Sequence, residues 1–190
     1  MPLSEPKAAR EPLHTRAIEI KGYKRADGLF DIEGRLADTK SYDFKLAAGV
    51  RRAGEAVHGM WLRITIDRTL TIVDAEAAMD AVPYVGYCEA IEPHYRKLVG
   101  LAIRPGYHRK LKELFGDVRG CTHISELAGA LATAAIQTLA GQRVQAPDQR
   151  PFPLDRCHAL DSTKPAVAKY YPKWYRGTEP LEPAAESDHH

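Results

Sequence analysis

The first half of the chain alternates between apolar and polar residues with the period of two that is typical of half-buried β-strands. In the clearest case, residues 57–67 (VHGMWLRITID), every second residue from Met60 to Ile66 is apolar and faces one side. The same alternation recurs in three shorter stretches: residues 14–22 (HTRAIEIKG), 28–37 (GLFDIEGRLA) and 70–75 (LTIVDA). Together these segments predict an antiparallel β-meander of about four strands.

The period becomes helical beyond residue 80. Residues 88–99 and 107–115 carry apolar stripes at helical spacing, and the longest helical pattern runs from Ile124 to Leu139 and ends near Gly141. Strands that come first and helices that come later predict an α+β fold, with the helices packed on one face of the sheet.

The ends of the chain differ from its centre in composition. Residues 1–13 contain three prolines and alternating charges, which predicts a disordered lead-in to a single α+β domain at residues 14–145. Residues 146–178 lack a clear period but are rich in aromatic residues, so we expect an ordered C-terminal arm that wraps over the domain. Residues 179–190 are expected to form a disordered tail.

Composition excludes several classes of partner. The chain of 190 residues has 27 basic and 25 acidic residues and a net charge of +2, which gives no electrostatic basis for binding nucleic acid. No apolar run approaches the roughly 20 residues of a membrane span, and the N-terminus lacks the apolar core of a signal peptide. Three widely spaced cysteines do not form a disulfide framework. We therefore expect a cytoplasmic protein without a membrane partner, and homo-oligomerisation stays open.

The start of the last helical pattern, Gly120 to His123 (GCTH), carries the most informative chemistry. Unpaired N–H groups at a helix start favour a thiolate, and an imidazole lies two residues beyond Cys121. Such a pair either holds a metal or acts as a polar catalytic pair. The alternative interpretation is a buried cysteine beside an N-terminal capping turn.

Two further sets of side chains are candidates for function. The metal-ligand set combines soft sulfur with imidazole, which suits Zn²⁺, Fe²⁺ or an iron–sulfur unit, and contains His58, Cys88, Cys121 and His123, with Cys157 and His158 as more distant members. The second set is aromatic and polar. In it Tyr84 and Tyr87 join His58, His123 and Cys121 in catalysis, and substrate is bound by Trp61, Arg63 and Tyr95.

The motifs of this chain resemble those of a bacterial family catalogued as a domain of unknown function. The similar segments are His58 to Arg63 (HGMWLR), Gly120 to His123 (GCTH) and Cys157 to Leu160 (CHAL). The resemblance covers most of residues 14–175. It implies an association with the degradation of aromatic and lignin-derived compounds.

The order of elements also resembles the layout of iron–sulfur scaffold proteins of the IscU, NifU and SufU kind, a SufE/NifU-like layout. There, one ligand precedes a β-strand and two cysteines open the helices that follow. Here His58 precedes a strand, while Cys88 and Cys121 open helices. The chain departs from this pattern at His58, because the scaffold proteins have Cys or Asp at the corresponding position. This resemblance implies a metal site where the three residues meet.

From these observations we expect a small-molecule enzyme, a lyase that uses acid–base chemistry on a phenolic or other aromatic, lignin-derived substrate and releases a small aldehyde such as formaldehyde. His58 or His123 would be its base. The alternative is a zinc or iron–sulfur scaffold protein without its own reaction, and a third is an inert small-molecule binder. Neither GxGxxG nor GxxxxGK[ST] occurs, so we expect no nucleotide cofactor, and either no cofactor or a single Zn or Fe.

Overall fold

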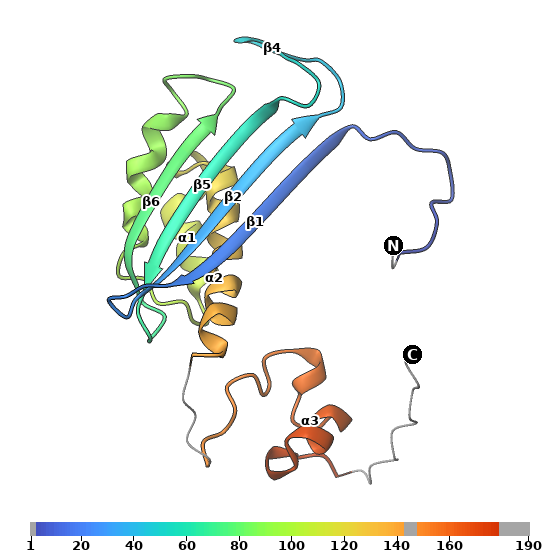
Figure 1. Ribbon diagram of the computed structural model, residues 1–190, viewed down its shortest axis with the longest axis vertical. Helices are drawn as coiled ribbons and strands as arrows, with labels where there is room; N and C mark the ends of the chain where they lie inside the picture. The colour runs from blue at the N-terminus through green and yellow to red at the C-terminus, as the bar shows by residue number, and fades with distance from the viewer. Residues whose placement is uncertain (1–2, 143–147, 179–190) are drawn as a thin grey trace. The chain divides into compact units, whose positions relative to one another are not determined.

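Four long antiparallel strands form the sheet of the N-terminal unit, as the alternation predicted (Figure 1). The computed structural model describes residues 3–142 and 148–178. The strands lie in the order β1-β2-β5-β6, with bounds β1 (His14–Lys24), β2 (Phe30–Lys40), β5 (Ala56–Ile66) and β6 (Ile72–Ala81). A small hairpin of β3 (Phe44–Leu46) and β4 (Gly49–Arg51) connects β2 to β5.

Helices cover one face of this sheet, which confirms the α+β class. They are η1 (Glu89–Leu98), α1 (Tyr107–Phe115), η2 (Asp117–Arg119) and α2 (Thr122–Ala140). Helix α2 packs across β1, β2 and β5, α1 packs on α2, and η1 packs against β6 (Figure 1). In the described ranges, no helix combines the length and the apolar character needed to cross a bilayer.

Glycines on the core-facing side of the sheet allow α2 to approach closely. A Cβ added at Gly34 would lie 2.8 Å from Leu127 Cδ1 and 3.0 Å from Leu131 Cδ2, and one at Gly22 would collide with Thr138. The apolar face of α2 therefore packs directly on the strand backbone, and its N-terminus lies over one end of the sheet. This contact positions the candidate site.

The segment predicted as the first helix is a 3₁₀-helix that begins one residue after Cys88. Pro93 lies inside it, at the fifth residue, where its missing N–H removes an α-helical hydrogen bond. The predicted apolar stripe is present, because Tyr95 and Leu98 are fully buried. The predicted helix at residues 107–115 matches α1 at both ends.

The described residues 148–178 belong to a second unit. It contains η3 (His158–Leu160), α3 (Pro165–Tyr170) and η4 (Pro172–Trp174), with Leu154, Val167 and Ala168 buried. The wrapping of this arm over the domain stays a prediction. Residues 3–13 form no helix or strand, and the predicted tail at 179–190 lies outside the described residues, as do residues 143–147.

Candidate functional site

Polar side chains end the core-facing rows of three neighbouring strands. In β2 the row runs through Phe30, Ile32 and Leu36, and its next position is Asp38. In β5 the core-facing positions lead to His58, and in β1 they lead to Arg16. Asp38 pairs with Arg16 on one side and with His58 on the other. Strand register therefore places a cation, a carboxylate and an imidazole side by side on the inner face.

Asp38 is the centre of this cluster. Its side chain is 6% exposed, and Arg16 binds both of its oxygens at 2.8 Å through Nε and Nη2. His14 Nε2 lies 2.9 Å from Oδ1 and His58 Nδ1 lies 3.1 Å from Oδ2. The Arg16 guanidinium also reaches Glu126 of α2 at 2.5 Å. Bidentate contacts between an arginine and a carboxylate hold both groups in fixed orientations.

The N-terminus of α2 adds a second imidazole to the cluster. The rings of His123 and His58 stack with centroids 3.9 Å apart and an interplanar angle of 30°. His123 Nε2 lies 3.4 Å from Asp38 Oδ2, and its Nδ1 lies 3.7 Å from Cys121 Sγ. Both rings are about one-fifth exposed, so solvent or a small molecule reaches them. Of the four residues expected to share this site, His58, His123 and Cys121 therefore lie together, and no contact of Cys88 with them is found in the described chain.

Burial and charge set the protonation of this cluster. Burial lowers the pKa of His58 below 6.5, although Asp38 acts in the opposite direction. Burial and the neighbouring His58 likewise lower the pKa of His123. Burial would raise the pKa of Asp38, but hydrogen bonds from Arg16 and His14 outweigh it and hold that pKa well below 3.8. At neutral pH the site therefore contains an ionised carboxylate beside two neutral imidazoles.

A buried tyrosine fixes the backbone of Cys121. The Tyr95 hydroxyl donates to the Cys121 carbonyl at 2.8 Å and accepts the Cys121 N–H at 2.9 Å. Its ring stacks on Phe115 with centroids 4.5 Å apart and is fully buried. Tyr95 was expected to bind substrate, and this is corrected: its hydroxyl is used within the fold, so it acts on the site only through the backbone.

Three ligand atoms at the cluster could hold a metal ion. One atom each of Asp38, His58 and His123 lie within 4.8 Å of one another. A carboxylate with two imidazoles suits Zn²⁺ or Fe²⁺. This group contains no cysteine, although a ligand set of thiolate and imidazole was expected.

Comparison with known proteins identifies the family of this chain. Residues 14–137 match the family described as "Protein of unknown function (DUF2889)". The chain belongs to this family. The predicted membership of a family of unknown function is thus confirmed. Neither the curated proteins nor the solved structures include a match to this chain, so the iron–sulfur scaffold layout stays a prediction.

The DUF2889 region contains every residue of the cluster, from His14 to Glu126, and it ends before Cys157 and His158. Those two residues lie in the second unit, where Cys157 is exposed and precedes η3. Their contribution to a site stays a prediction.

Two residues predicted to bind substrate lie on the opposite face of the DUF2889 sheet from His58, so their part in substrate binding stays a prediction. Trp61 and Arg63 alternate with the core-facing residues of β5, so they point away from His58 and its neighbours. Trp61 Nε1 donates to Asp80 at 2.9 Å, and Arg63 pairs with Glu33 and Glu76. These partners are exposed and hold the two side chains on the solvent side.

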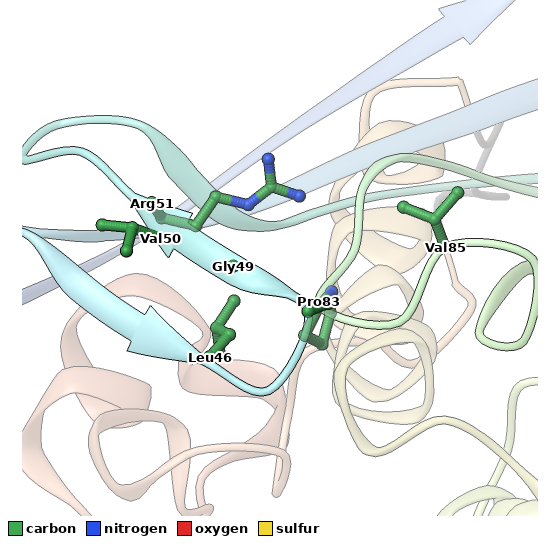
Figure 2. Close-up of a pocket in the computed structure, with 7 residues that line it drawn as sticks. Leu46, Gly49, Val50, Arg51, Pro83 and Val85 are labelled. Carbon is green, nitrogen blue, oxygen red and sulfur yellow. The ribbon is translucent and has the colours of Figure 1, made fainter.

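The remaining candidates lie in the loop that follows β6 and at the start of η1. Tyr84 and Tyr87 are 52% and 83% exposed. Cys88 is partly buried and packs against the hydrophobic core, and its sulfur does not belong to the ligand group described above. The same loop borders a cavity of about 210 Å³ between Pro83, Val85 and the β3–β4 hairpin (Figure 2).

Sequence reasoning missed His14, Arg16 and Asp38. A signal was present, because Asp38 continues the alternation of Ile32 and Leu36 by one more step, and His58 continues that of Met60. A charged residue at a core-facing position needs a partner. Applied to β1, β2 and β5 together, this rule would have located the cluster.

Proposed function

We propose that this protein is a small-molecule lyase that acts on a phenolic aromatic substrate by acid–base chemistry and releases formaldehyde. The observation that carries the proposal is the contact of His58 Nδ1 with the buried carboxylate of Asp38 at 3.1 Å. With Nδ1–H donated to Asp38, the other ring nitrogen carries the lone pair of a base. The lowered pKa of His58 keeps this nitrogen unprotonated at neutral pH.

The stacked pair supplies the two bases that such a reaction needs. His58 takes the proton of the phenol, and the phenolate expels a benzylic leaving group, which departs with that proton and leaves a quinone methide. His123 then takes the proton of a neighbouring hydroxymethyl group. The carbon–carbon bond breaks, its electron pair restores the phenolate, and formaldehyde leaves. No oxidant or reductant is consumed.

Charge in the cluster supports an anionic intermediate. Arg16 brings a guanidinium that is 32% exposed, and its two contacts with Asp38 fix its orientation. A phenolate beside this cation would be stabilised as its charge develops. The apolar part of the substrate would be bound by residues of the same end of the sheet, among them Leu46, Val50, Pro83 and Val85 around the cavity in Figure 2.

The test uses a phenol that has a benzylic aryl ether and an adjacent hydroxymethyl group. Purified protein should release formaldehyde and the protonated leaving group, a second phenol, in equal amounts. His58→Gln should lower turnover by about 10²–10⁴-fold, the range for loss of a general base. His94→Gln is the matched control, because His94 is an exposed histidine that contacts Lys97. Formaldehyde release that is equal in both variants would rule out the proposed role of His58.

A metal centre is the second candidate, and the grouping of Asp38, His58 and His123 favours it. Two features oppose it in the present geometry. First, the guanidinium of Arg16 already pairs with the carboxylate of Asp38 and would repel a metal cation there. Second, the imidazole rings of His58 and His123 lie face to face, so their in-plane lone pairs are parallel and do not converge on one point. An ion shared by both rings would require one of them to turn.

Elemental analysis separates the two candidates. A metal-dependent protein should carry about one Zn or Fe per chain, and Asp38→Asn should remove it. An iron–sulfur cluster needs cysteine thiolates, so its presence would instead make metal content depend on Cys88 and Cys121. Metal content that His94→Gln preserves and Asp38→Asn abolishes would favour the metal centre over metal-free acid–base chemistry.

A further inference from the structure

Cys121 lies where a nucleophile would lie in a relay of thiol, imidazole and carboxylate. Its Sγ is 3.7 Å from His123 Nδ1, and the opposite nitrogen of the same ring, Nε2, is 3.4 Å from Asp38 Oδ2. The imidazole therefore has a proton donor on one side and an anion on the other. We propose that Cys121 is a nucleophile for acyl groups, with His123 as its base and Asp38 as the group that orients His123.

The backbone around Cys121 is held in place for this role. Tyr95 bonds both the N–H and the carbonyl of Cys121, and Ser125 N–H donates to the same carbonyl at 2.9 Å. These contacts fix the first residue before α2 relative to η1. A nucleophile held by buried partners keeps its distance from its base without further ordering.

The start of α2 supplies the second requirement of acyl transfer. Helix α2 begins one residue after Cys121, and the N–H groups of its first turn have no acceptor within the helix. Such donors stabilise the oxyanion that forms when a thiol adds to a carbonyl. Cys88 and Cys157 differ: the contacts of the described chain pair only the Cys121 sulfur with an imidazole.

The reaction balances without an added oxidant or reductant. The thiol proton passes to His123 Nδ1 as Sγ forms a bond to the acyl carbon. The bond from that carbon to the leaving oxygen or sulfur breaks, and the leaving group takes the proton from His123. Water then attacks the thioester, releases a carboxylic acid and restores the thiol. The substrate class is therefore an ester or a thioester of a small acid.

The first experiment measures thiol reactivity in the full chain, with no substrate. Iodoacetamide is added at neutral pH, and alkylation of each cysteine peptide is followed by mass spectrometry. The ratio of the rates at Cys121 and at exposed Cys157 is the readout, so every sample contains its own control. His123→Asn should lower this ratio roughly tenfold or more, Asp38→Asn should lower it too, and His94→Gln should leave it unchanged.

The second experiment uses p-nitrophenyl acetate. A burst of nitrophenol should accompany one acetyl group on Cys121, and His123→Asn should abolish the burst. Circular dichroism verifies that each variant is folded. A ratio that His123→Asn does not change, or an acetyl group found on another residue, would overturn the proposal. Alkylation requires no lyase turnover, so this result is independent of whether formaldehyde release is observed.

Discussion

At the scale of single residues, one carboxylate organises the site. Asp38 stands at a position that strand alternation reserves for an apolar side chain, and it is stable there because Arg16 and three histidines surround it. A buried charge without partners would cost several kcal/mol. Hydrogen bonds from Arg16 and His14 keep Asp38 ionised, and burial keeps the imidazoles of His58 and His123 neutral.

Two arginines, on the strands β1 and β5 that flank β2, allow a matched test of this account. Arg16→Gln removes two hydrogen bonds to a buried carboxylate, so we expect it to lower the free energy of unfolding by about 2 kcal/mol. Arg63→Gln removes ion pairs to the exposed Glu33 and Glu76 and should change it by only about 0.5 kcal/mol. Urea denaturation of both variants measures the difference. Equal losses would mean that Asp38 does not depend on its arginine.

The pKa shifts also predict how stability depends on pH. His58 and His123 have pKa values below 6.5 in the folded protein, so the unfolded chain takes up protons first as the pH falls. The free energy of unfolding should therefore decrease below pH 6.5. Asp38 has a folded pKa below 3.8, so its contribution is present above 3.8 and is lost on further acidification.

Denaturant titrations across this pH range provide the measurement. His123→Gln should flatten the decrease below pH 6.5, because that variant has one neutral imidazole fewer to protonate. Stability that rises on mild acidification would show that the folded protein holds the imidazoles in their charged form.

At the scale of elements, the close packing of α2 on β2 positions His123 over the strands. The contact depends on Gly34, where a methyl group would meet two fully buried leucines, Leu127 and Leu131. Gly34→Ala should therefore cost about 1–3 kcal/mol through overpacking. Thermal or urea unfolding measures the loss.

Gly141 provides the control for that substitution. It follows α2, has φ −82°, and has no heavy atom within 4 Å of an added Cβ. Gly141→Ala should therefore stay within about 0.5 kcal/mol of the parent protein. A similar loss for both variants would show that Gly34 acts through the backbone and not through its contact with α2.

The elements were predictable from the sequence because their signals are local. The alternation from Met60 to Ile66 and the stripe from Ile124 to Leu139 each lie within one element, and both predicted the right structure. The site was only half predictable, because the contact of Asp38 with His58 depends on the register between β2 and β5. The β3–β4 hairpin separates these two strands in the sequence, and its irregular pattern does not indicate their register. Trp61 was expected to bind substrate, and it lies three residues from His58 along β5, an odd spacing that places the two side chains on opposite faces of the sheet.

At the scale of the whole molecule, the chain divides into a unit that carries the site and a second unit that follows it. The hydrophobic core cluster runs from Phe30 to Leu139, within the first unit. Each residue of the polar cluster, from His14 to Glu126, lies in the same unit. We therefore expect the first unit to fold and to hold the proposed bases without the residues beyond Gln142.

A chain that ends at Gln142 should accordingly fold, with far-UV circular dichroism typical of α+β structure and cooperative unfolding by urea. Aggregation or loss of cooperativity would contradict the independence of the first unit. Turnover of the shortened chain then tests the arm, because Cys157 and His158 are absent from it. If the arm completes the site, formaldehyde release should fall while the fold is kept, and Cys157→Ser or His158→Gln in the full chain should reproduce part of that loss. If turnover is unchanged, the stacked imidazoles and Asp38 are sufficient, and the aromatic residues of the arm serve only the second unit.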